Sequence, residues 1–255
     1  MIDIELLKIL YCTPFLLYSC YTDLKIRRVS NQVWKVMLIG GSLFVVYDII
    51  NTGMPALLRL VLSAGIIFIF VYILFQFGTF GGADAKCLIV LAIIIPVYPQ
   101  IELFGVEYPL MGIPLINLFA FTVFGNAVLL TIVVPSSLFI YNLIALKPHE
   151  ILKDPAYLFV GYKTDISKLQ GRHIKLIHER FLVDSVLQTR FKRGGVDIKE
   201  NIIKELETFA HNDMMDRHVW VTPGMPFIIP ITLGFYMAIF FGDLIFYITR
   251  QLIMM

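Results

Sequence analysis

Two aspartates in this sequence occupy positions where acid–base chemistry is possible. Asp23 lies in the stretch TDLKIRRVSN and Asp84 in the stretch FGGADAK, and each stands where an apolar run meets a polar segment. Charged groups are costly in hydrocarbon, so an ionisable residue at such a boundary is a candidate functional residue. Two carboxyl groups that come together can divide the work of hydrolysis. The ionised one takes a proton from water while the protonated one polarises a carbonyl.

The chain as a whole is too apolar for an ordinary soluble domain. Its 255 residues are 58% hydrophobic and its mean hydropathy is +0.79, whereas about half of a typical globular domain is apolar. Runs close to the roughly 20 residues that cross a bilayer predict an α-helical, polytopic membrane protein with about six transmembrane helices. These spans are expected at residues 4–21, 33–50, 60–83 and 84–99, once within 108–146, and at 226–249. We expect the fifth span to be bent or broken at Pro135.

Basic residues indicate which side of the membrane each loop occupies. With the amino terminus outside, 18 of the 21 Lys and Arg residues fall on the inner side. The short loop of residues 25–28 agrees with this orientation, and short loops follow the positive-inside rule most closely. In this topology the first span ends at Asp23 and the fourth begins at Asp84. Both carboxyl groups are therefore expected at the cytoplasmic face of the membrane.

Two further aspartates near apolar spans, Asp48 and Asp243, lie towards the opposite ends of their spans. We expect them to be interfacial or hydrogen-bonded to neighbouring helices. The shared depth of Asp23 and Asp84 suits the chemistry of an aspartic protease. A simpler interpretation fits the residues equally well: each aspartate caps a helix end, as Asp84 would at the positive amino-terminal end of the fourth span.

The residues around both aspartates resemble the motifs of one enzyme family. TDLKIRRVSN resembles the Asp-Leu-Lys-x-x-x-(Ile/Val)-x-Asn segment of type IV prepilin peptidases and their archaeal preflagellin relatives, and FGGADAK resembles their Gly-x-Gly-Asp-x-Lys segment. That family consists of membrane-embedded aspartic peptidases that remove short basic leader peptides on the cytoplasmic side. The resemblance implies that Asp23 and Asp84 are the catalytic pair and that preflagellin or pilin-like precursors are the substrates. It covers the first third of the chain, with a weaker similarity at PGMPFIIP before the last span.

The second motif departs from the family pattern at one position. Gly81 matches its first glycine and Lys86 its lysine, but Ala83 stands where the pattern has a second glycine. Alanine is small enough to keep a close approach, although it gives up free access to positive φ. We expect Gly81 and Gly82 to form a hinge that moves Asp84 into place when substrate binds.

Cysteine and histidine placement gives no sign of a metal or another cofactor. Cys12, Cys20 and Cys87 lie in or at the ends of apolar spans, where thiols most often pack as small hydrophobic groups. The five histidines all lie in a polar insert without metal-ligand spacing, so neither zinc nor a disulfide is expected. The larger bacterial prepilin peptidases commonly carry a cysteine-rich zinc region. The resemblance therefore favours the smaller archaeal preflagellin peptidase, in a prokaryotic plasma membrane.

Residues 147–222 form the polar insert, between residues 1–146, which hold five spans, and residues 223–255, which hold the sixth. Its β-branched residues predict short strands. The stretch DIKENIIKELETFA predicts a helix with Asp197 as N-cap. The apolar face of this helix is expected to carry Ile198, Ile202, Leu206 and Phe209. A small mixed α/β cytoplasmic domain is therefore expected between the fifth and sixth helices.

The insert has an uneven charge. Residues 197–216 carry a net charge of −4 and residues 147–193 a net charge of +5. The simpler interpretation is a solvated acidic helix face below a basic, lipid-facing surface. The alternative is a docking site for a basic peptide, in which Glu200, Glu205 and Glu207 would bind the leader. The basic residues form no recognisable nucleic-acid-binding module.

Two other functions remain open. Acidic residues in spans also line proton-coupled transporters and channels, although no inverted repeat is recognisable here and both aspartates are expected at one face rather than at the midplane. Intramembrane proteases of the presenilin or signal-peptide-peptidase type also use Gly-x-Gly-Asp. In this chain Thr22 precedes Asp23 where that class has tyrosine, and no Pro-Ala-Leu lies near the last span.

Overall fold

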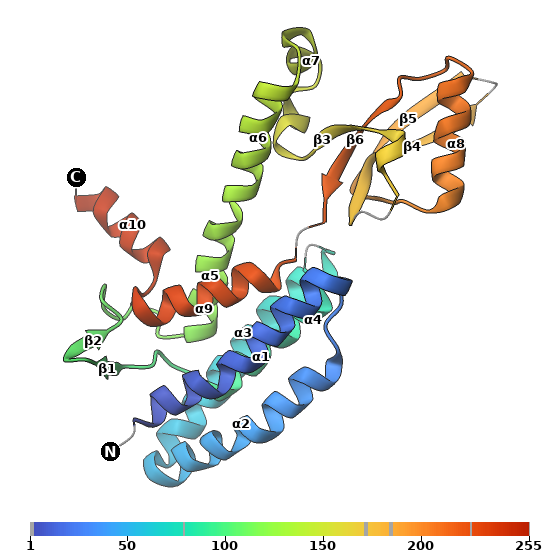
Figure 1. Cartoon of the computed structure of the whole chain (residues 1–255). Helices are drawn as coiled ribbons and strands as arrows, with labels where there is room; N and C mark the ends of the chain where they lie inside the picture. The colour runs from blue at the N-terminus through green and yellow to red at the C-terminus, as the bar shows by residue number, and fades with distance from the viewer. Residues whose placement is uncertain (1–2, 79, 171–172, 184–185, 225, 255) are drawn as a thin grey trace. The chain divides into compact units, whose positions relative to one another are not determined.

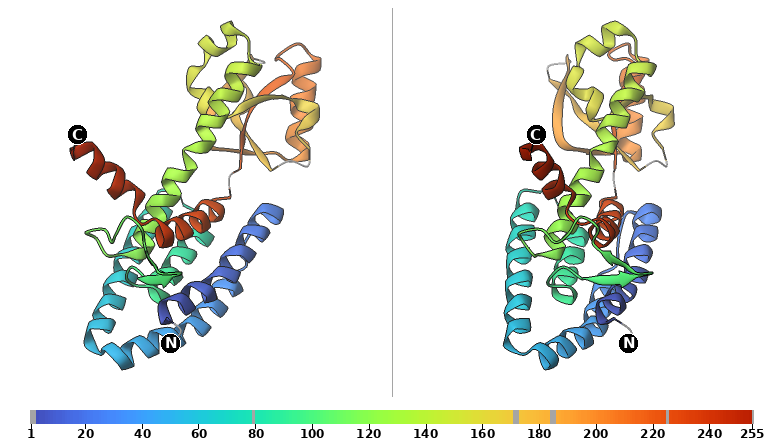
Figure 2. Two further views of the ribbon diagram at one scale, coloured as in Figure 1. Left: turned by 60° about the vertical axis from the view of Figure 1, so that its left-hand side comes forward. Right: turned by 90° about the vertical axis from the view of Figure 1, so that its left-hand side faces the viewer.

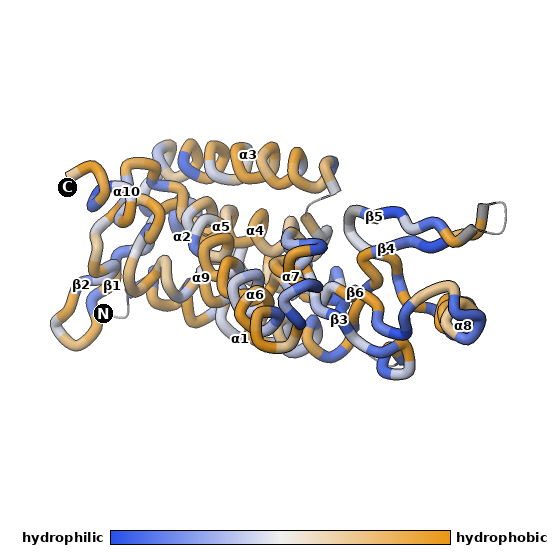
Figure 3. Tube along the Cα trace, turned by 90° about the horizontal axis from the view of Figure 1, so that it is seen from above, coloured by the Kyte–Doolittle hydropathy of each residue, from blue (hydrophilic) through white to orange (hydrophobic). Residues whose placement is uncertain are grey.

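The structure, a computed structural model, describes residues 3–254 with the exception of residues 79, 171–172, 184–185 and 225 (Figure 1). By its internal contacts the chain divides into two compact units. The first comprises Met1–Thr131 and Pro226–Met255, and the second comprises Ile132–Met225. Hydropathy distinguishes them, because the helices of the first unit are predominantly hydrophobic whereas the second mixes hydrophobic and hydrophilic segments (Figure 3).

Helices dominate the first unit. They are α1 (Ile4–Ile26), α2 (Asn31–Thr52), α3 (Met54–Gln76), α4 (Gly82–Ile94), α5 (Phe119–Thr131), α9 (Ile228–Phe240) and α10 (Leu244–Met254). The strands β1 (Ile101–Leu103) and β2 (Val106–Tyr108) form a small antiparallel hairpin between α4 and α5. α1 packs beside α2 (Figure 2), and α4 contacts α2, α3, α5 and α9.

Three helical stretches of the described chain are both long enough and apolar enough to cross a membrane: α2, α3 and Phe119–Ala145. α9 and α10 together would make a fourth, but they are bent by 60° at the break between them. α4 has 13 residues, a length of about 20 Å against a hydrocarbon core of about 30 Å. The structure thus agrees with the predicted helical membrane protein, but it does not show six full-length spans.

Two breaks in the apolar helices have local causes. α5 ends at Thr131 and α6 (Val133–Ala145) begins two residues later. Proline lacks an N–H and clashes with the carbonyl four residues before it, which for Pro135 is that of Thr131. Pro135 thus accounts for a one-residue interruption at Ile132, one turn ahead of the proline, while Phe119–Ala145 still forms one stretch long enough to cross a membrane. The span expected over residues 226–249 is divided into α9 and α10, which separate around Gly242, whose φ is +110°.

α4 is the buried centre of the first unit. Its buried side chains are Ala85, Cys87, Leu88, Val90, Leu91, Ala92 and Ile94. Glycines allow the neighbouring helices to approach closely: a Cβ at Gly41 of α2 would collide with Ile94, and one at Gly234 of α9 would lie 2.5 Å from the Val123 carbonyl oxygen of α5. Small residues at helix contacts are typical of membrane bundles. This packing holds α4, and with it Asp84, in a fixed frame.

The second unit contains a four-stranded antiparallel sheet, which confirms the predicted mixed α/β insert. Its order is β3-β6-β4-β5. Besides α6, its elements are α7 (Pro148–Lys153), η1 (Pro155–Phe159), β3 (Tyr162–Asp165), η2 (Ile166–Lys168), β4 (Ile174–Val183), β5 (Val186–Asp197), α8 (Glu200–His211) and β6 (His218–Pro223). Asn142 of α6 is fully buried and donates hydrogen bonds to the carbonyls of Leu158 (2.9 Å) and Gly161 (2.7 Å), which fixes α6 to η1.

The helix α8 differs from its prediction in its N-cap residue and in one residue of its apolar face. It begins at Glu200 with Lys199 as N-cap, not Asp197, because Asp197 ends β5 opposite Lys175 and forms an ion pair with it at 3.1 Å. Leu206 is buried. Ile198 and Ile202 pack around it as expected, together with Ile203 and Ala210, whereas Phe209 is not part of this cluster.

Candidate active site

Asp23 lies in the last turns of α1 and is partly buried. Its carbonyl oxygen accepts a hydrogen bond from the Arg27 amide at 3.1 Å, and Arg27 ends the helix in the left-handed conformation with φ +54°. The Arg27 guanidinium and the Ile228 backbone at the start of α9 both lie close enough to the Asp23 carboxylate to interact with it. The end of α1 and the beginning of α9 therefore meet at this carboxyl group.

Asp84 lies in the first turn of α4 and is also partly buried. Its carboxylate accepts a backbone hydrogen bond from Gly81. A Cβ at Gly81 would lie 2.6 Å from Asp84 Oδ2, so a side chain there would collide with the carboxylate. The φ of Gly81 is an ordinary −76°. A side chain at this position would therefore displace the carboxylate, although the backbone conformation itself would accept one.

The other motif positions are less constrained. A Cβ at Gly82 would meet only Phe75 Cε2, at an ordinary 3.7 Å. Gly82 and Ala83 form the first turn of α4, so alanine at the position of the missing motif glycine needs no positive φ. The departure from the family pattern thus fits the local backbone.

The two aspartates come together in the first unit although two helices separate them along the chain. Their carboxyl groups are close enough for the charge of Asp23 to act on Asp84. Of the ion pairs that the described residues form, none includes either aspartate. Two neighbouring carboxyl groups without a cation in contact can in principle accept protons from, and donate them to, a water molecule or a peptide.

A direct contact joins the two sequence motifs. Lys86 of the second motif donates a hydrogen bond from Nζ to Asn31 Oδ1 at 2.7 Å. Asn31 is the last residue of the first motif and the first residue of α2. Sequence reasoning noted both residues as motif members but gave them no joint role. Their contact fixes the start of α2 to the second turn of α4 and thereby helps to set the separation of the two aspartates.

Aromatic rings pack against one another beside the motif that carries Asp84. Phe80, which precedes the motif glycines, makes edge-on contacts with Phe124 of α5 at 5.8 Å and with Phe227 at 5.4 Å between ring centroids. Phe124 in turn lies 5.0 Å from Phe70 of α3. Sequence analysis missed Phe227, although the Pro-rich stretch PGMPFIIP that contains it was visible.

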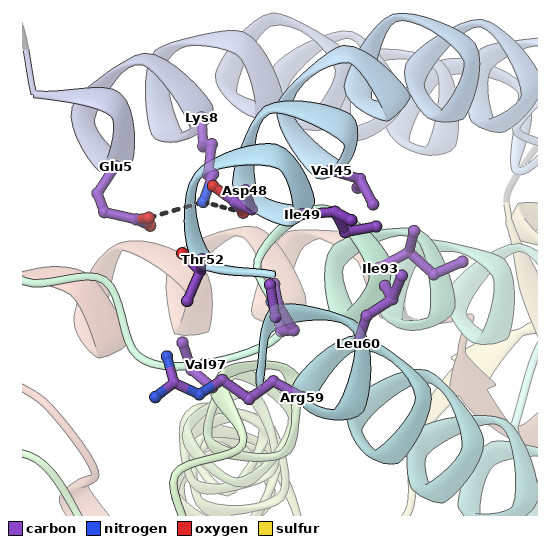
Figure 4. Close-up of a pocket in the computed structure, with 12 residues that line it drawn as sticks. Glu5, Lys8, Val45, Asp48, Ile49, Thr52, Arg59, Leu60, Ile93 and Val97 are labelled. Atoms are coloured by element: carbon purple, nitrogen blue, oxygen red, sulfur yellow. Dashed lines mark hydrogen bonds and ion pairs between the residues drawn. The ribbon is translucent and has the colours of Figure 1, made fainter. Parts of the chain in front are cut away.

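A second charged cluster lies in the same unit, between α1 and α2 (Figure 4). Lys8 is only 2% exposed, and its Nζ lies 2.6 Å from Glu5 Oε1 and 2.7 Å from Asp48 Oδ2. A cavity of about 100 Å³ adjoins it, with Arg59 across from the cluster. Each acidic group here has a cation in contact, which is the arrangement expected of a structural ion cluster.

The remaining candidate residues lie elsewhere. The expectation for Asp48 and Asp243 is confirmed, because Asp48 binds Lys8 of α1 and Asp243 accepts hydrogen bonds from Thr122 Oγ1 of α5 (3.1 Å) and the Phe246 amide (2.9 Å). The glutamates proposed to bind substrate, which are Glu200, Glu205 and Glu207, are exposed on α8 of the second unit. Within the described residues, no cluster of three or more His, Cys, Asp or Glu side chains could hold a metal ion.

Comparison with known proteins gives consistent matches along the chain. Residues 10–136 match the type IV leader peptidase family, and residues 153–244 match the archaeal peptidase A24 C-terminus, type II. A preflagellin peptidase of Methanococcus voltae is 31% identical over 236 residues, which cover 89% of this chain and 92% of the relative. Preflagellin peptidases of Methanococcus maripaludis and Methanocaldococcus jannaschii are 24% and 25% identical, over 89% of this chain and 92% and 91% of the relatives. Both aspartates fall inside the first matched region.

Proposed function

The chain belongs to the type IV leader peptidase family together with the archaeal preflagellin peptidases, and on that premise we propose that it is an aspartic endopeptidase acting through Asp23 and Asp84. Its substrates are preflagellin or pilin-like precursors, from which it removes the leader peptide. The observation that carries the catalytic assignment is the meeting of two partly buried carboxyl groups, neither of which is ion-paired within the described residues.

The chemistry follows from the properties of a carboxyl pair. Two like charges at close range do not readily both ionise, so one proton is held within the pair. The ionised carboxylate takes a proton from a water molecule as that water attacks the scissile carbonyl carbon. The protonated carboxyl donates a hydrogen bond to the carbonyl oxygen, where negative charge develops. Transfer of a proton to the leaving amine then completes hydrolysis and restores the pair.

The proposed orientation places the amino terminus outside and both aspartates at the cytoplasmic face of the membrane. Basic residues support it, since 18 of the 21 lie on the inner side in that topology. A leader that carries positive charge also stays on the cytoplasmic side by the same rule. The acidic face of α8, with Glu200, Glu205 and Glu207, is proposed to attract such a leader.

A processing assay tests the catalytic assignment. Membranes that contain the wild type, Asp23→Asn or Asp84→Asn are incubated with a preflagellin precursor, and the loss of the leader is followed by electrophoresis. We expect the wild type to shorten the precursor and both variants to leave it intact. Asp243→Asn serves as the matched control, because it makes the same chemical change at an aspartate that lies outside the pair and should retain cleavage. Substantial cleavage by either motif variant would contradict the assignment of Asp23 and Asp84 as the catalytic pair.

A further inference from the structure

The start of α9 is connected to Asp23 by a short chain of contacts. The Cys20 thiol, three residues before Asp23, donates to Thr232 Oγ1 at 3.1 Å. Thr232 is 4% exposed and its hydroxyl donates to the Ile228 carbonyl at 2.9 Å. The Cys20 thiol also lies 3.8 Å from the same Ile228 carbonyl oxygen, and the Ile228 backbone lies close enough to the Asp23 carboxylate to interact with it. The first turn of α9 therefore contacts α1 both at the catalytic carboxylate and one turn before it.

The same turn also reaches the second aspartate. Phe227, the N-cap residue of α9, places its ring 5.4 Å from that of Phe80 with an interplanar angle of 73°. Phe80 is followed at once by Gly81, whose amide binds the Asp84 carboxylate. Edge-to-face pairs of this geometry add about 0.5–1.5 kcal/mol beyond their buried area. A displacement of Phe227 would therefore be transmitted to the backbone donor of Asp84.

We propose that the start of α9, with Phe227, Ile228 and Thr232, is a positioning element that sets the relative position of Asp23 and Asp84 for the chemical step. The inference rests on the proposed aspartic mechanism and extends it to residues that do not touch substrate. The N-cap residue Phe227 has no side-chain acceptor for the amides of α9, and the first amides of a helix lack partners within it. Asp23 of another helix supplies one acceptor. The helix end thus gains a partner while the carboxylate gains a fixed orientation.

Thr232 allows the Asp23 side of this element to be tested. Thr232→Val keeps the shape of the side chain but removes the hydroxyl that accepts from Cys20 and donates to Ile228. We expect kcat to fall about 10-fold with KM within about twofold of the wild type, since small misplacements of a reacting group lower the rate of the chemical step. Thr232→Ser restores the hydroxyl and should restore kcat. Thr122→Val is the matched control, because Thr122 is 2% exposed and its hydroxyl binds Asp243 rather than the active site.

The Asp84 side is tested by a pair of aromatic substitutions on α9. Phe227→Leu keeps an apolar side chain but loses the edge-on contact with Phe80. Its control is Phe235→Leu, since Phe235 makes a similar contact with Phe119 at 5.6 Å and 75° two turns further along the helix. Phe235 is fully buried whereas Phe227 is only partly buried. A purely structural role would make the Phe235 variant the more harmful of the two. We expect the reverse order for kcat.

The pH dependence of kcat separates positioning from folding. Its limbs report the apparent pKa values of the carboxyl pair, so a changed separation shifts the profile, whereas a smaller folded fraction only scales it. We expect shifted profiles for Thr232→Val and Phe227→Leu and unshifted ones for both controls. Variants that match their controls in kcat and profile overturn the inference. If Asp23→Asn or Asp84→Asn still cleaves the precursor, the proposed mechanism itself fails, which is a separate outcome.

Discussion

The first unit holds two groups of acidic side chains that differ in their partners. Glu5 and Asp48 both contact the buried Lys8, at 2.6 and 2.7 Å. Asp23 and Asp84 are instead bound by backbone donors and interact with each other. Both groups consist of carboxyl side chains, and each joins two helices. The absence of a cation in contact, rather than the presence of an acid in an apolar helix, distinguishes the proposed reactive pair from the ion cluster.

The two arrangements have opposite energetic consequences. In a buried ion cluster, removal of one partner leaves the others unpaired and destabilises the fold. In a pair of like charges, neutralising one member relieves repulsion, so function is lost while stability is kept or gained. Activity and stability can therefore be measured side by side in both groups. Substitutions in the carboxyl pair should lower activity without lowering stability, and substitutions in the ion cluster should lower stability without lowering activity.

The largest expected effect is on activity, at the carboxyl pair. Asp23→Asn, Asp84→Asn and the double variant should all abolish leader cleavage, and the double variant should be no worse than either single one. Residues that act as one unit in a reaction have strongly non-additive effects. Thermal unfolding of the purified variants in detergent should occur at or above the wild-type midpoint. Additive losses would show that the two carboxyl groups act in separate steps. A lowered midpoint of thermal unfolding would indicate that they have a structural role instead.

The second effect is on stability, at the ion cluster. Lys8→Met removes the cation and leaves Glu5 and Asp48 without it, which should cost about 3 kcal/mol. Asp48→Asn keeps a hydrogen-bond acceptor and the Glu5 contact, so its loss should be smaller. Unfolding in detergent would measure both. The kcat of the folded fraction should equal that of the wild type in each case. A Lys8→Met protein that is stable but inactive would show that this cluster takes part in cleavage and would remove the contrast between the two groups.

The sequence singles out the two proposed catalytic acids better than it predicts how they are held. Topology predicts one depth for Asp23 and Asp84, because alternating spans and loop charge are encoded locally. The apolar spans and the mixed insert were likewise visible in hydropathy. Local pattern could not reveal that α4 is short, since a helix surrounded by others need not match the bilayer. Nor could it pair Lys8 with Asp48 or Phe80 with Phe227, because such contacts depend on packing between distant segments. The misassigned N-cap Asp197 has the same origin, as β5 pairing overrode the local capping signal.

The motif glycines allow the geometry of the reactive pair to be examined. Gly81→Ala would place a Cβ 2.6 Å from Asp84 Oδ2, so the carboxylate must move. We expect kcat to fall by about 10- to 100-fold without a comparable change in KM. Gly82→Ala is the matched control, because its Cβ meets only an ordinary contact at 3.7 Å, and it should cleave at close to the wild-type rate.

The hinge expected from the sequence predicts a further distinction at the same position. Gly82→Val should lower kcat although Gly82→Ala does not, since a β-branched residue stiffens the backbone. Stopped assays at saturating precursor would measure both. Equal rates for Gly82→Val and Gly82→Ala would exclude a hinge at this residue and leave close approach at Gly81 as the role of the glycines.

The smallest expected effect concerns acids of a third kind, exposed on α8 of the second unit. Substitution of Glu200, Glu205 and Glu207 by Gln should raise KM for a basic leader roughly fivefold at low salt, because exposed charge pairs contribute only a fraction of a kcal/mol each. The effect should shrink at high salt, where exposed charges are screened, and kcat should stay unchanged. Glu102→Gln combined with Glu107→Gln is the control for acidic charge, since these exposed residues face each other on the β1–β2 hairpin. An unchanged KM at low salt would show that the acidic face of α8 is a solvated surface without a role in substrate binding. The acids of this chain would then fall into only two groups, the proposed catalytic pair and the ion cluster.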